Sequence, residues 1–295
     1  MQPLSNGLRV MTMMSVRNEG DVIEEAVREL ARWVPLIVVL DGGSTDGTYE
    51  TLQRIARRQS DLDVELDLIQ EDAASAAGPY QEYKREQVYR RARIHGAFDW
   101  CMMIDADEIF HTSPIQAIEW AEAEGAQCVI PFKPEFWLTV DDLRSGALVE
   151  DERISVQQRR LWYSWCWREN RIWREHPDLH YWPDAMHGKH VDPWRLDGRS
   201  WPELQSVTCL AHMLPILKHY PIRSVRQGIA KMEDRVPRGR RDFGKMSECW
   251  IMDEGFCQLR QFDGRWDYEP TQPRIRQWYA EARRRAEVTG LCAPR

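Results

Sequence analysis

Hydrophobic and polar positions follow two periodicities in the N-terminal part of the chain. Short and almost wholly apolar runs, which predict buried strands of a parallel sheet, lie at residues 8–16, 36–40 and 100–104. Helical patterns between the strands cover residues 21–34, 49–59 and 81–97, the last of them basic and largely polar. Residues 62–68 alternate apolar with acidic side chains, which predicts a half-exposed strand. This order predicts an α/β fold with a right-handed, mostly parallel sheet flanked by helices.

The pattern changes beyond the third apolar run. Thr112 or Ser113 can cap a helix that has Pro114 in its first turn, and residues 127–132 return to a strand pattern. Residues 133–201 have poor periodicity and are rich in aromatic side chains, arginine and histidine. Helical patterns return at residues 224–235, 247–261 and 272–288. The chain therefore predicts a helical C-terminal tail.

Composition narrows the class of protein. The 295 residues carry a formal net charge of −7 with a pI near 5.7, which argues against a generally basic nucleic-acid coat. The seven cysteines form no CxxC pair, which fits reduced thiols rather than a disulfide framework. No run approaches the roughly 18 to 20 apolar residues of a membrane span, and the N-terminus lacks the pattern of a signal peptide. We therefore expect a cytoplasmic protein.

Acidic side chains follow the third apolar run, in the stretch FDWCMMIDADEIF. Asp105, Asp107 and Glu108 would lie outside the carboxyl end of a parallel strand, where ligands of open α/β sheets bind. Two like charges about 4 Å apart repel by roughly 4 kcal/mol at an effective dielectric constant of 20, so the cluster needs a counter-cation. A divalent metal would meet this need, and a solvated acidic turn is the alternative.

A glycine-rich turn, DGGSTDG, follows the second apolar run. Its glycines allow positive φ and close approach of the backbone to a ligand. Asp41 would lie at the strand end and accept hydrogen bonds from a nucleobase or ribose. The stretch is neither GxGxxG nor a P-loop, so dinucleotide and γ-phosphate binding lose support. An ordinary strand-to-helix turn with a capping Thr or Ser is the alternative.

Three stretches occur in one order: VRNEGDVIEEAV after the first strand, DGGSTDGT after the second, and then FDWCMMIDADEIF. In this order and spacing they resemble the nucleotide-sugar domain of family 2 glycosyltransferases of the GT-A type. The stretch HYPIRSVRQGIAKM, from His219, is similar to a C-terminal segment of some branches of that family. The resemblance implies a nucleotide-sugar half at residues 1–112, an acceptor half of the same domain at 113–220 and a helical extension at 221–295.

The resemblance also implies roles for individual residues. Asp41 would bind the base of a uridine-type nucleotide, and Asp105 and Asp107 match the DxD motif that holds Mn²⁺ or Mg²⁺ on the diphosphate. His219 would be a third metal or phosphate ligand, with a buried structural histidine as the alternative. The residues expected to bind the donor are Ser15, Arg17, Glu19, Asp41, Gly43, Lys84, Arg85, Asp105 and Ala106.

Other charged residues lie next to these candidates. Lys84 and Arg85 would meet phosphate or sugar hydroxyls, or else they form a solvated helix face. Glu108 follows the DxD motif directly, and we expect it to support the ligands rather than to bind the metal.

The chain differs from the family in the residues expected to supply the catalytic base. Inversion by direct displacement requires a carboxylate base on the acceptor side. Related chains often carry His-Glu after a strand, whereas here His187 is followed by Gly188. Asp184 is therefore the first candidate, followed by His187, Glu135 and Asp192.

Arginine alternates with tryptophan and tyrosine over residues 159–182. Such a segment offers stacking surfaces and guanidinium groups for sugar rings or nucleobases, or else it forms a packed aromatic core. A functional surface here would suit a hydroxylated base in DNA as the acceptor. Arg238, Arg240 and Arg241 would then add contacts to the DNA backbone.

The resemblance thus implies a metal-dependent hexosyltransferase that moves a sugar from a UDP-sugar to a hydroxyl acceptor with inversion. The acceptor would be a hydroxylated base in DNA, a glycan or a small molecule. Two alternatives stay open: a nucleotidyltransferase on a similar fold, and a non-catalytic module that binds nucleic acid or glycan.

Overall fold

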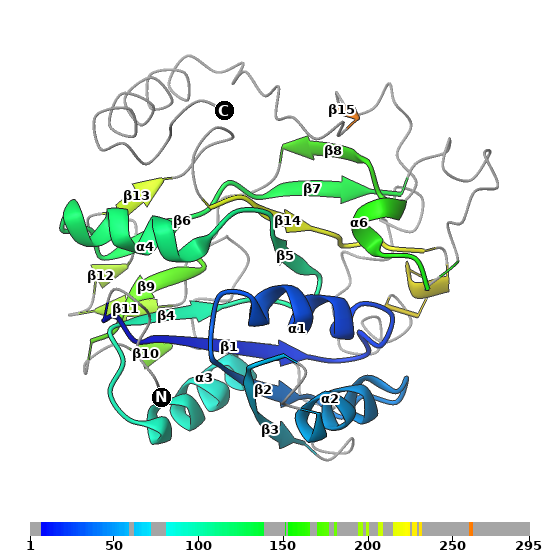
Figure 1. Cartoon of the computed structure of the whole chain (residues 1–295), viewed down its shortest axis with the longest axis horizontal. Helices are drawn as coiled ribbons and strands as arrows, with labels where there is room; N and C mark the ends of the chain where they lie inside the picture. The colour runs from blue at the N-terminus through cyan, green and yellow to red at the C-terminus, as the bar shows by residue number, and fades with distance from the viewer. Residues whose placement is uncertain are drawn as a thin grey trace.

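The structure is a computed structural model, and it describes residues 7–58, 62–71, 81–138, 151, 153–165, 170–176, 180–181, 194–196, 199–200, 206–208, 215–224, 226–228, 230–231 and 260–261. Within these residues the strands form a large seven-stranded sheet, a five-stranded sheet and a small three-stranded sheet. Figure 1 shows the large sheet below the five-stranded one, with helices on both sides of the large sheet.

The large sheet has a parallel centre. Its strand order is β13-β6-β9-β4-β1-β2-β3. The four strands at one side of this order are parallel: β1 (Val10–Val16), β2 (Leu36–Asp41), β3 (Glu65–Gln70) and β4 (Trp100–Met103). Every residue of β2 and β4 is buried, as the apolar runs predict. The predicted α/β fold with a mixed, mostly parallel sheet is confirmed.

Helices cover both faces of this sheet. They are α1 (Ile23–Ala31), α2 (Thr48–Arg57), α3 (Gln81–Ala92) with the short η3 (Arg93–His95), and α4 (Pro114–Ala123). Leu30 of α1 and Leu52 of α2 belong to the apolar cluster on one face, and Val88 of α3 belongs to the cluster on the other. The side chain of Ser113 accepts a hydrogen bond from the Gln116 amide, so the predicted cap of α4 is confirmed.

A short antiparallel strand lies inside the large sheet. The strand β9 (Ile172–Arg174) pairs with β4 on one side and with β6 (Cys128–Ile130) on the other. Beyond β6 lies β13 (Ser206–Thr208), which is parallel to it. Trp173 of β9 is fully buried, so this tryptophan of the aromatic segment serves the core. Sequence patterns do not predict β9, because three residues are too few to show a period.

The five-stranded sheet brings distant parts of the chain to the end of β4. Its order is β15 (Arg260–Gln261), β8 (Trp162–Trp165), β7 (Pro134–Trp137), β14 (Leu217–His219) and β5 (Glu108–Phe110). In this sheet β14 pairs antiparallel with β5, the strand that directly follows Asp107. The strand β14 also pairs with β7. The helix α6 (Val156–Arg159) precedes β8. The small sheet consists of β10 (His180–Tyr181), β11 (Trp194–Leu196) and β12 (Arg199–Ser200).

The predicted C-terminal helices fall only in part on described residues. Residues 226–228 and 230–231 are helical, within the first predicted helix. The second prediction is wrong at its end, because Arg260 and Gln261 form the strand β15 and pair with Tyr163 and Trp162. The third helix, at residues 272–288, lies outside the described residues. Among the helices that are described, none is long and apolar enough to cross a membrane.

Candidate active site

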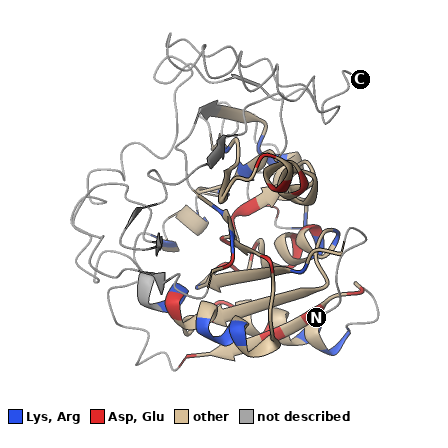
Figure 2. Cartoon of the chain, turned by 90° about the vertical axis from the view of Figure 1, so that its left-hand side faces the viewer, with Lys and Arg blue, Asp and Glu red and all other residues tan. Residues whose placement is uncertain are grey.

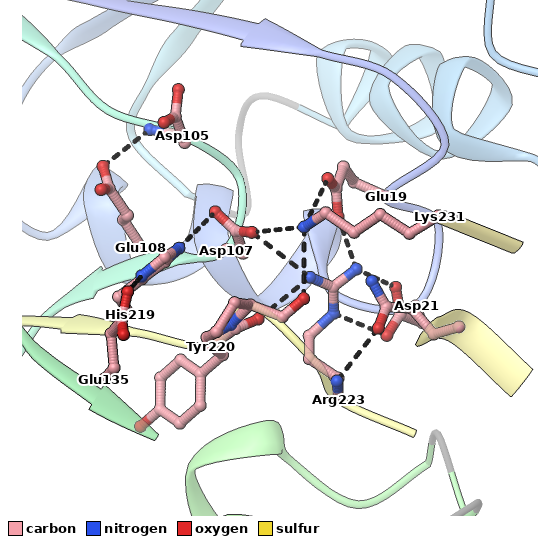
Figure 3. A network of polar contacts seen from close by, with 12 residues as sticks. Glu19, Asp21, Asp105, Asp107, Glu108, Glu135, His219, Tyr220, Arg223 and Lys231 are labelled. Atoms are coloured by element: carbon pink, nitrogen blue, oxygen red, sulfur yellow. Dashed lines mark hydrogen bonds and ion pairs between the residues drawn. The ribbon is translucent and has the colours of Figure 1, made fainter. Parts of the chain in front are cut away.

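The candidate site lies where β1, β2 and β4 end. Because these strands are parallel and adjacent in the sheet, their carboxyl ends lie at one edge, and the predicted chemical groups of all three come together there. The segment after β14 joins them from the five-stranded sheet, and its Arg223 and Lys231 side chains lie next to Asp107 (Figure 3). Basic and acidic positions are interspersed along the described helices and strands (Figure 2).

Asp41 ends β2 with a fully buried side chain. Its Oδ1 accepts hydrogen bonds from the amides of Gly43 at 3.0 Å and Ser44 at 2.9 Å, and Gly43 has a φ of 74° that favours glycine. Its Oδ2 is buried and has no hydrogen-bond partner in the described part of the chain. A buried carboxylate oxygen without a partner is costly, so this oxygen is ready to accept a hydrogen bond from a ligand.

Lys84 and Arg85 connect this turn to the acidic stretch. The Lys84 ammonium lies 3.2 Å from Glu71 Oε2 and 3.5 Å from the carbonyl oxygen of Gly42. A Cβ on Gly42 would come within 2.2 Å of the Lys84 Nζ, so a side chain at this position would displace the Lys84 ammonium. The Arg85 guanidinium donates to both carboxylate oxygens of Asp105 at 3.0 Å. Neither side chain forms the solvated helix face that was the alternative, since both are largely buried.

Asp105 is held by arginines from two elements. Besides Arg85, Arg171 at the start of β9 donates to its Oδ2 at 2.7 Å. Arg171 also contacts Glu108 Oε1 at 2.6 Å, and Lys133 lies 2.5 Å from the same oxygen. Burial would raise the pKa of Asp105, but Arg171 and Arg85 outweigh it and hold the pKa below its ordinary value.

Glu108 contacts the backbone of the acidic stretch through its side chain. Its side chain is fully buried, and its Oε2 accepts the backbone amide of Asp105 at 3.0 Å. Ala106, between the two aspartates, is buried as well. This geometry agrees with the expectation that Glu108 orients its neighbours rather than binding a ligand itself.

Asp107 faces the segment that follows β14. Its Oδ2 accepts a hydrogen bond from Lys231 Nζ at 2.8 Å, and its Oδ1 lies 3.7 Å from His219 Nε2. The Arg223 Nη1 lies 3.8 Å from Oδ2, and the Tyr220 amide donates to the Asp107 carbonyl oxygen at 2.8 Å. Burial would raise the pKa of Asp107, but Lys231, His219 and Arg223 hold it well below its ordinary value.

His219 lies between two carboxylates. Its Nδ1 is 3.1 Å from Glu135 Oε1 on β7, and its Nε2 faces Asp107. Burial and Lys133 would lower the pKa of His219, but the two carboxylates raise it above the ordinary value. Glu135, a later candidate for the base, is thus engaged by a histidine next to the acidic stretch.

Arg223 ties the loop after β1 to the segment after β14. Its guanidinium is fully buried and lies 2.5 Å from Glu19 Oε2 and 2.7 Å from Asp21 Oδ1. Its carbonyl oxygen accepts hydrogen bonds from the guanidinium groups of Arg159, at 3.2 Å, and Arg160. Burial raises the pKa of Glu19, whereas Arg223 outweighs burial at Asp21 and lowers its pKa.

The remaining donor candidates lie beside these groups. Ser15 is the penultimate residue of β1 and is paired in register with Leu40 of β2. Arg17 donates to the carbonyl oxygen of Gly42 at 2.7 Å. The nucleotide-side candidates, from Ser15 to Ala106, therefore lie along one edge of the sheet.

The residues predicted to hold a metal meet only in part. Among the described residues, no group of three His, Cys, Asp or Glu side chains is arranged to hold a metal ion. Asp105 is turned onto arginines, whereas Asp107 and His219 face each other. The oxygen of Asp107 already contacts a cation, the ammonium of Lys231. Carboxylate oxygens are hard ligands that suit a divalent ion, but the ammonium of Lys231 lies where such an ion would bind Asp107.

Several residues of the site escape sequence reasoning, and others stay untested. Asp184, His187 and Asp192 lie outside the described residues, as do Arg238, Arg240 and Arg241. The residues that were missed are Asp21, Lys133, Arg171, Arg223 and Lys231. Asp21 lies within the first stretch of the resemblance, Arg223 and Lys231 lie within HYPIRSVRQGIAKM, and Arg171 lies within the segment at residues 159–182, so these stretches carried the signal that could have found them.

The sequence matches no protein-family model and no curated protein. Some solved structures match part of the chain. TarS of S. aureus is 16% identical with a TM-score of 0.32, over 45% of this chain and 22% of TarS. The mannosyltransferase PcManGT of Pyrobaculum calidifontis, in complex with GDP-Man and Mn²⁺, is 24% identical with a TM-score of 0.35, over 43% of this chain and 36% of that protein.

A putative glucose-1-phosphate thymidylyltransferase of Bacillus anthracis is 14% identical with a TM-score of 0.31, over 43% of this chain and 55% of that one. The chain thus spans about a fifth to about half of the length of these proteins. The structural neighbours thus include a mannosyltransferase and a putative thymidylyltransferase, each similar over less than half of this chain and at a TM-score below 0.5. Identities and TM-scores this low transfer no donor, acceptor or metal.

Proposed function

We propose that this protein transfers a sugar from a nucleotide-diphospho-sugar, a UDP-hexose, to a hydroxyl acceptor. The observation that carries the proposal is the buried Oδ2 of Asp41, which lacks a hydrogen-bond partner among the described residues at the ligand-binding edge of a parallel sheet. The imide N–H of a uracil base would satisfy that oxygen. A ligand donor at this position would pair an acceptor that the described residues leave unpaired.

The arrangement from Asp41 to Asp105 supports a ligand with a base at one end and a diphosphate at the other. Gly42 lies against Lys84, and Arg85, the next residue, contacts Asp105. The donor's base would lie at Asp41 and its diphosphate near Lys84, Arg85 and Asp105. Arginine and lysine at this position suit phosphate oxygens, because they supply several donors together with positive charge.

Asp107, Asp105 and His219 are the residues that would hold Mn²⁺ or Mg²⁺. The chemistry that a bound divalent ion would supply is neutralisation of the charge on the departing nucleoside diphosphate. For the chain's own part, Glu108 and Arg171 orient Asp105, and Glu135 orients His219. Inversion requires a base on the acceptor side, for which Asp184 and His187 remain the candidates.

The acceptor is proposed to carry a hydroxyl group and to meet the segment at residues 159–182. Within it Trp173 and Tyr163 are buried, so a binding surface would have to use its other aromatic and arginine side chains. A hydroxylated base in DNA, a glycan and a small hydroxylated molecule are the acceptors to be screened.

Binding of UDP tests the donor proposal most directly. Replacing Asp41 with Asn would place an amide N–H₂ group against the uracil N–H and weaken UDP binding by roughly ten- to hundredfold, the range for a charge-assisted hydrogen bond. Isothermal titration calorimetry measures the effect. Asp99→Asn is the matched control, because Asp99 pairs with Arg9 at the opposite end of β4. Equal UDP affinity in wild type and Asp41→Asn would refute the assignment.

Chemistry is tested with a panel of nucleotide sugars and Mn²⁺. Release of UDP from one of them, lost in an Asp105→Asn, Asp107→Asn variant that keeps its thermal unfolding transition, is the expected result. Release of pyrophosphate from a nucleoside triphosphate would instead identify a nucleotidyltransferase. UDP binding without any turnover would point to a non-catalytic module.

A further inference from the structure

Lys231 lies between the acidic stretch and the loop after β1. Its ammonium donates to Asp107 Oδ2 at 2.8 Å and to the Pro221 carbonyl oxygen at 3.3 Å, and it lies 3.7 Å from Glu19 Oε1 (Figure 3). The side chain is 12% exposed, which is low for a lysine. The ammonium thus has three oxygen neighbours, two of them within hydrogen-bond distance.

This position conflicts with a metal on the same carboxylate. A divalent ion binds a carboxylate oxygen at roughly 2.1 Å, and it would then lie within a few ångströms of the ammonium. Two cations at such a distance in a buried site repel strongly, because little water screens them. Lys231 and a metal ion therefore cannot occupy Asp107 Oδ2 at the same time.

The other cations of the site cannot take over this role without a change of partner. Arg223 is held by Glu19 and Asp21, and its distance to Asp107 is 3.8 Å. Arg171 is committed to Asp105 and Glu108. Lys231 is thus the cation whose departure would open Asp107.

We propose that Lys231 is the resting counter-cation of Asp107, and that a divalent metal binds Asp107 only by displacing it. The inference rests on the proposed function in taking Asp107 as a metal ligand. It assigns to Lys231 the control of how tightly the free protein holds a metal. It also couples the segment after β14 to the occupancy of the site, since Lys231 and Arg223 belong to that segment.

Titration with Mn²⁺ alone, followed by electron paramagnetic resonance of the free ion, tests the proposal. Lys231→Met is expected to bind Mn²⁺ roughly ten- to hundredfold more tightly than wild type, because the charge-assisted hydrogen bond that competes with the metal is gone. Lys231→Arg keeps the charge and should retain the weak affinity of wild type. An Mn²⁺ affinity of Lys231→Met no higher than that of wild type overturns the proposal.

Lys218→Met is the matched control. It removes another buried lysine, on the strand β14, by the same substitution, but the Lys218 ammonium lies 3.4 Å from Gln157 Oε1 and over the ring of Phe136. Its Mn²⁺ affinity should equal that of wild type. An equal gain in both methionine variants would show a general effect of charge and overturn the specific role of Lys231.

A second measurement uses the wild-type protein, so it does not depend on the folding of a variant. Acetic anhydride modifies exposed amines, and mass spectrometry then reports the extent at each lysine. Mn²⁺ should increase the modification of Lys231 several-fold and leave that of Lys218 unchanged. No increase at Lys231 would overturn the proposal.

Neither measurement contains a nucleotide, so the two proposals can fail separately. A protein that shows the expected Mn²⁺ responses but binds no UDP would refute the proposed donor alone. A protein that binds UDP through Asp41 but shows no gain in Lys231→Met would refute the role of Lys231 alone.

Discussion

Replacement of Arg223 by methionine should destabilise the protein more than any other single loss of charge in the site. The Arg223 guanidinium is completely buried and contacts Glu19 at 2.5 Å and Asp21 at 2.7 Å. Methionine fills most of the volume but leaves two buried carboxylates without their cation. Breaking a buried ion pair by removing one partner costs about 3 to 5 kcal/mol.

That magnitude is large against the whole stability of a domain, which is about 5 to 15 kcal/mol. A loss of about 4 kcal/mol corresponds to roughly a thousandfold change in the folding equilibrium. Lys231 compensates little, because its ammonium is 3.7 Å from Glu19 and is already bonded to Asp107.

Urea unfolding at pH 7, followed by circular dichroism, measures the difference in unfolding free energy. Arg9→Met is the control, because Arg9 forms a comparable pair with Asp99 whose side chains are 38% and 34% exposed. Exposed pairs contribute about 0 to 1 kcal/mol, so this variant should lose at most that amount. A loss of less than about 1 kcal/mol in Arg223→Met would refute the buried-charge argument.

The pH dependence of the stability of Arg223→Met is an independent test of the same argument. Without Arg223, burial raises the pKa of Glu19 and Asp21 in the folded protein above the unfolded values of 4.5 and 3.8. The folded variant therefore takes up protons before the unfolded chain does, and its stability increases as pH falls towards those values. The deficit relative to wild type should be smaller at pH 5 than at pH 7.

Three further predictions concern other buried groups. Burial lowers the pKa of Lys218 to about 8 from 10.5, so Lys218→Met should stabilise the protein at pH 7 by up to about 3 kcal/mol. That gain should shrink between pH 8 and pH 10.5 in urea unfolding, because the unfolded chain alone holds the proton there, and a constant gain would contradict the reasoning. Gly42→Ala should weaken UDP binding with little loss of stability, because its Cβ displaces only the flexible end of the Lys84 side chain, and calorimetry with thermal unfolding separates the two effects. Asp21→Asn should lose less stability than wild type as pH falls below about 4, since the depressed pKa of Asp21 adds stability only above that pH.

The centre of the fold could be predicted from sequence because its signals are local. The runs at β1, β2 and β4 are apolar on both faces, as strands covered by helices must be. Ser113 and Pro114 mark the start of α4 through a cap and a fixed φ, both of which act within one turn. The positions of Asp41 and Asp105 could be predicted as well, because they lie at the carboxyl ends of β2 and β4.

The neutralisation of the acidic stretch could not be predicted in the same way. Lys231 meets Asp107 across 124 positions and Arg171 meets Asp105 across 66, and such pairs leave no periodic trace in the sequence. The repulsion between the carboxylates predicted a counter-cation, and we expected a metal ion. In the described residues, the counter-cations are lysine and arginine side chains. The short strands β9 and β14 position these side chains, and each is three residues long.

The strand β9 has a consequence for the protein during its synthesis. A nascent chain that ends after β6 contains β4 and β6 but lacks the strand that bonds to both, so the β4 backbone presents open amides and carbonyls. Such an open edge can pair with another chain and aggregate. The arrival of β9 closes this edge and brings Arg171 onto Asp105 and Glu108 in the same step. The pairing of β9 with β4 and the contacts of Arg171 with Asp105 and Glu108 therefore form in a single event in the assembly of the molecule.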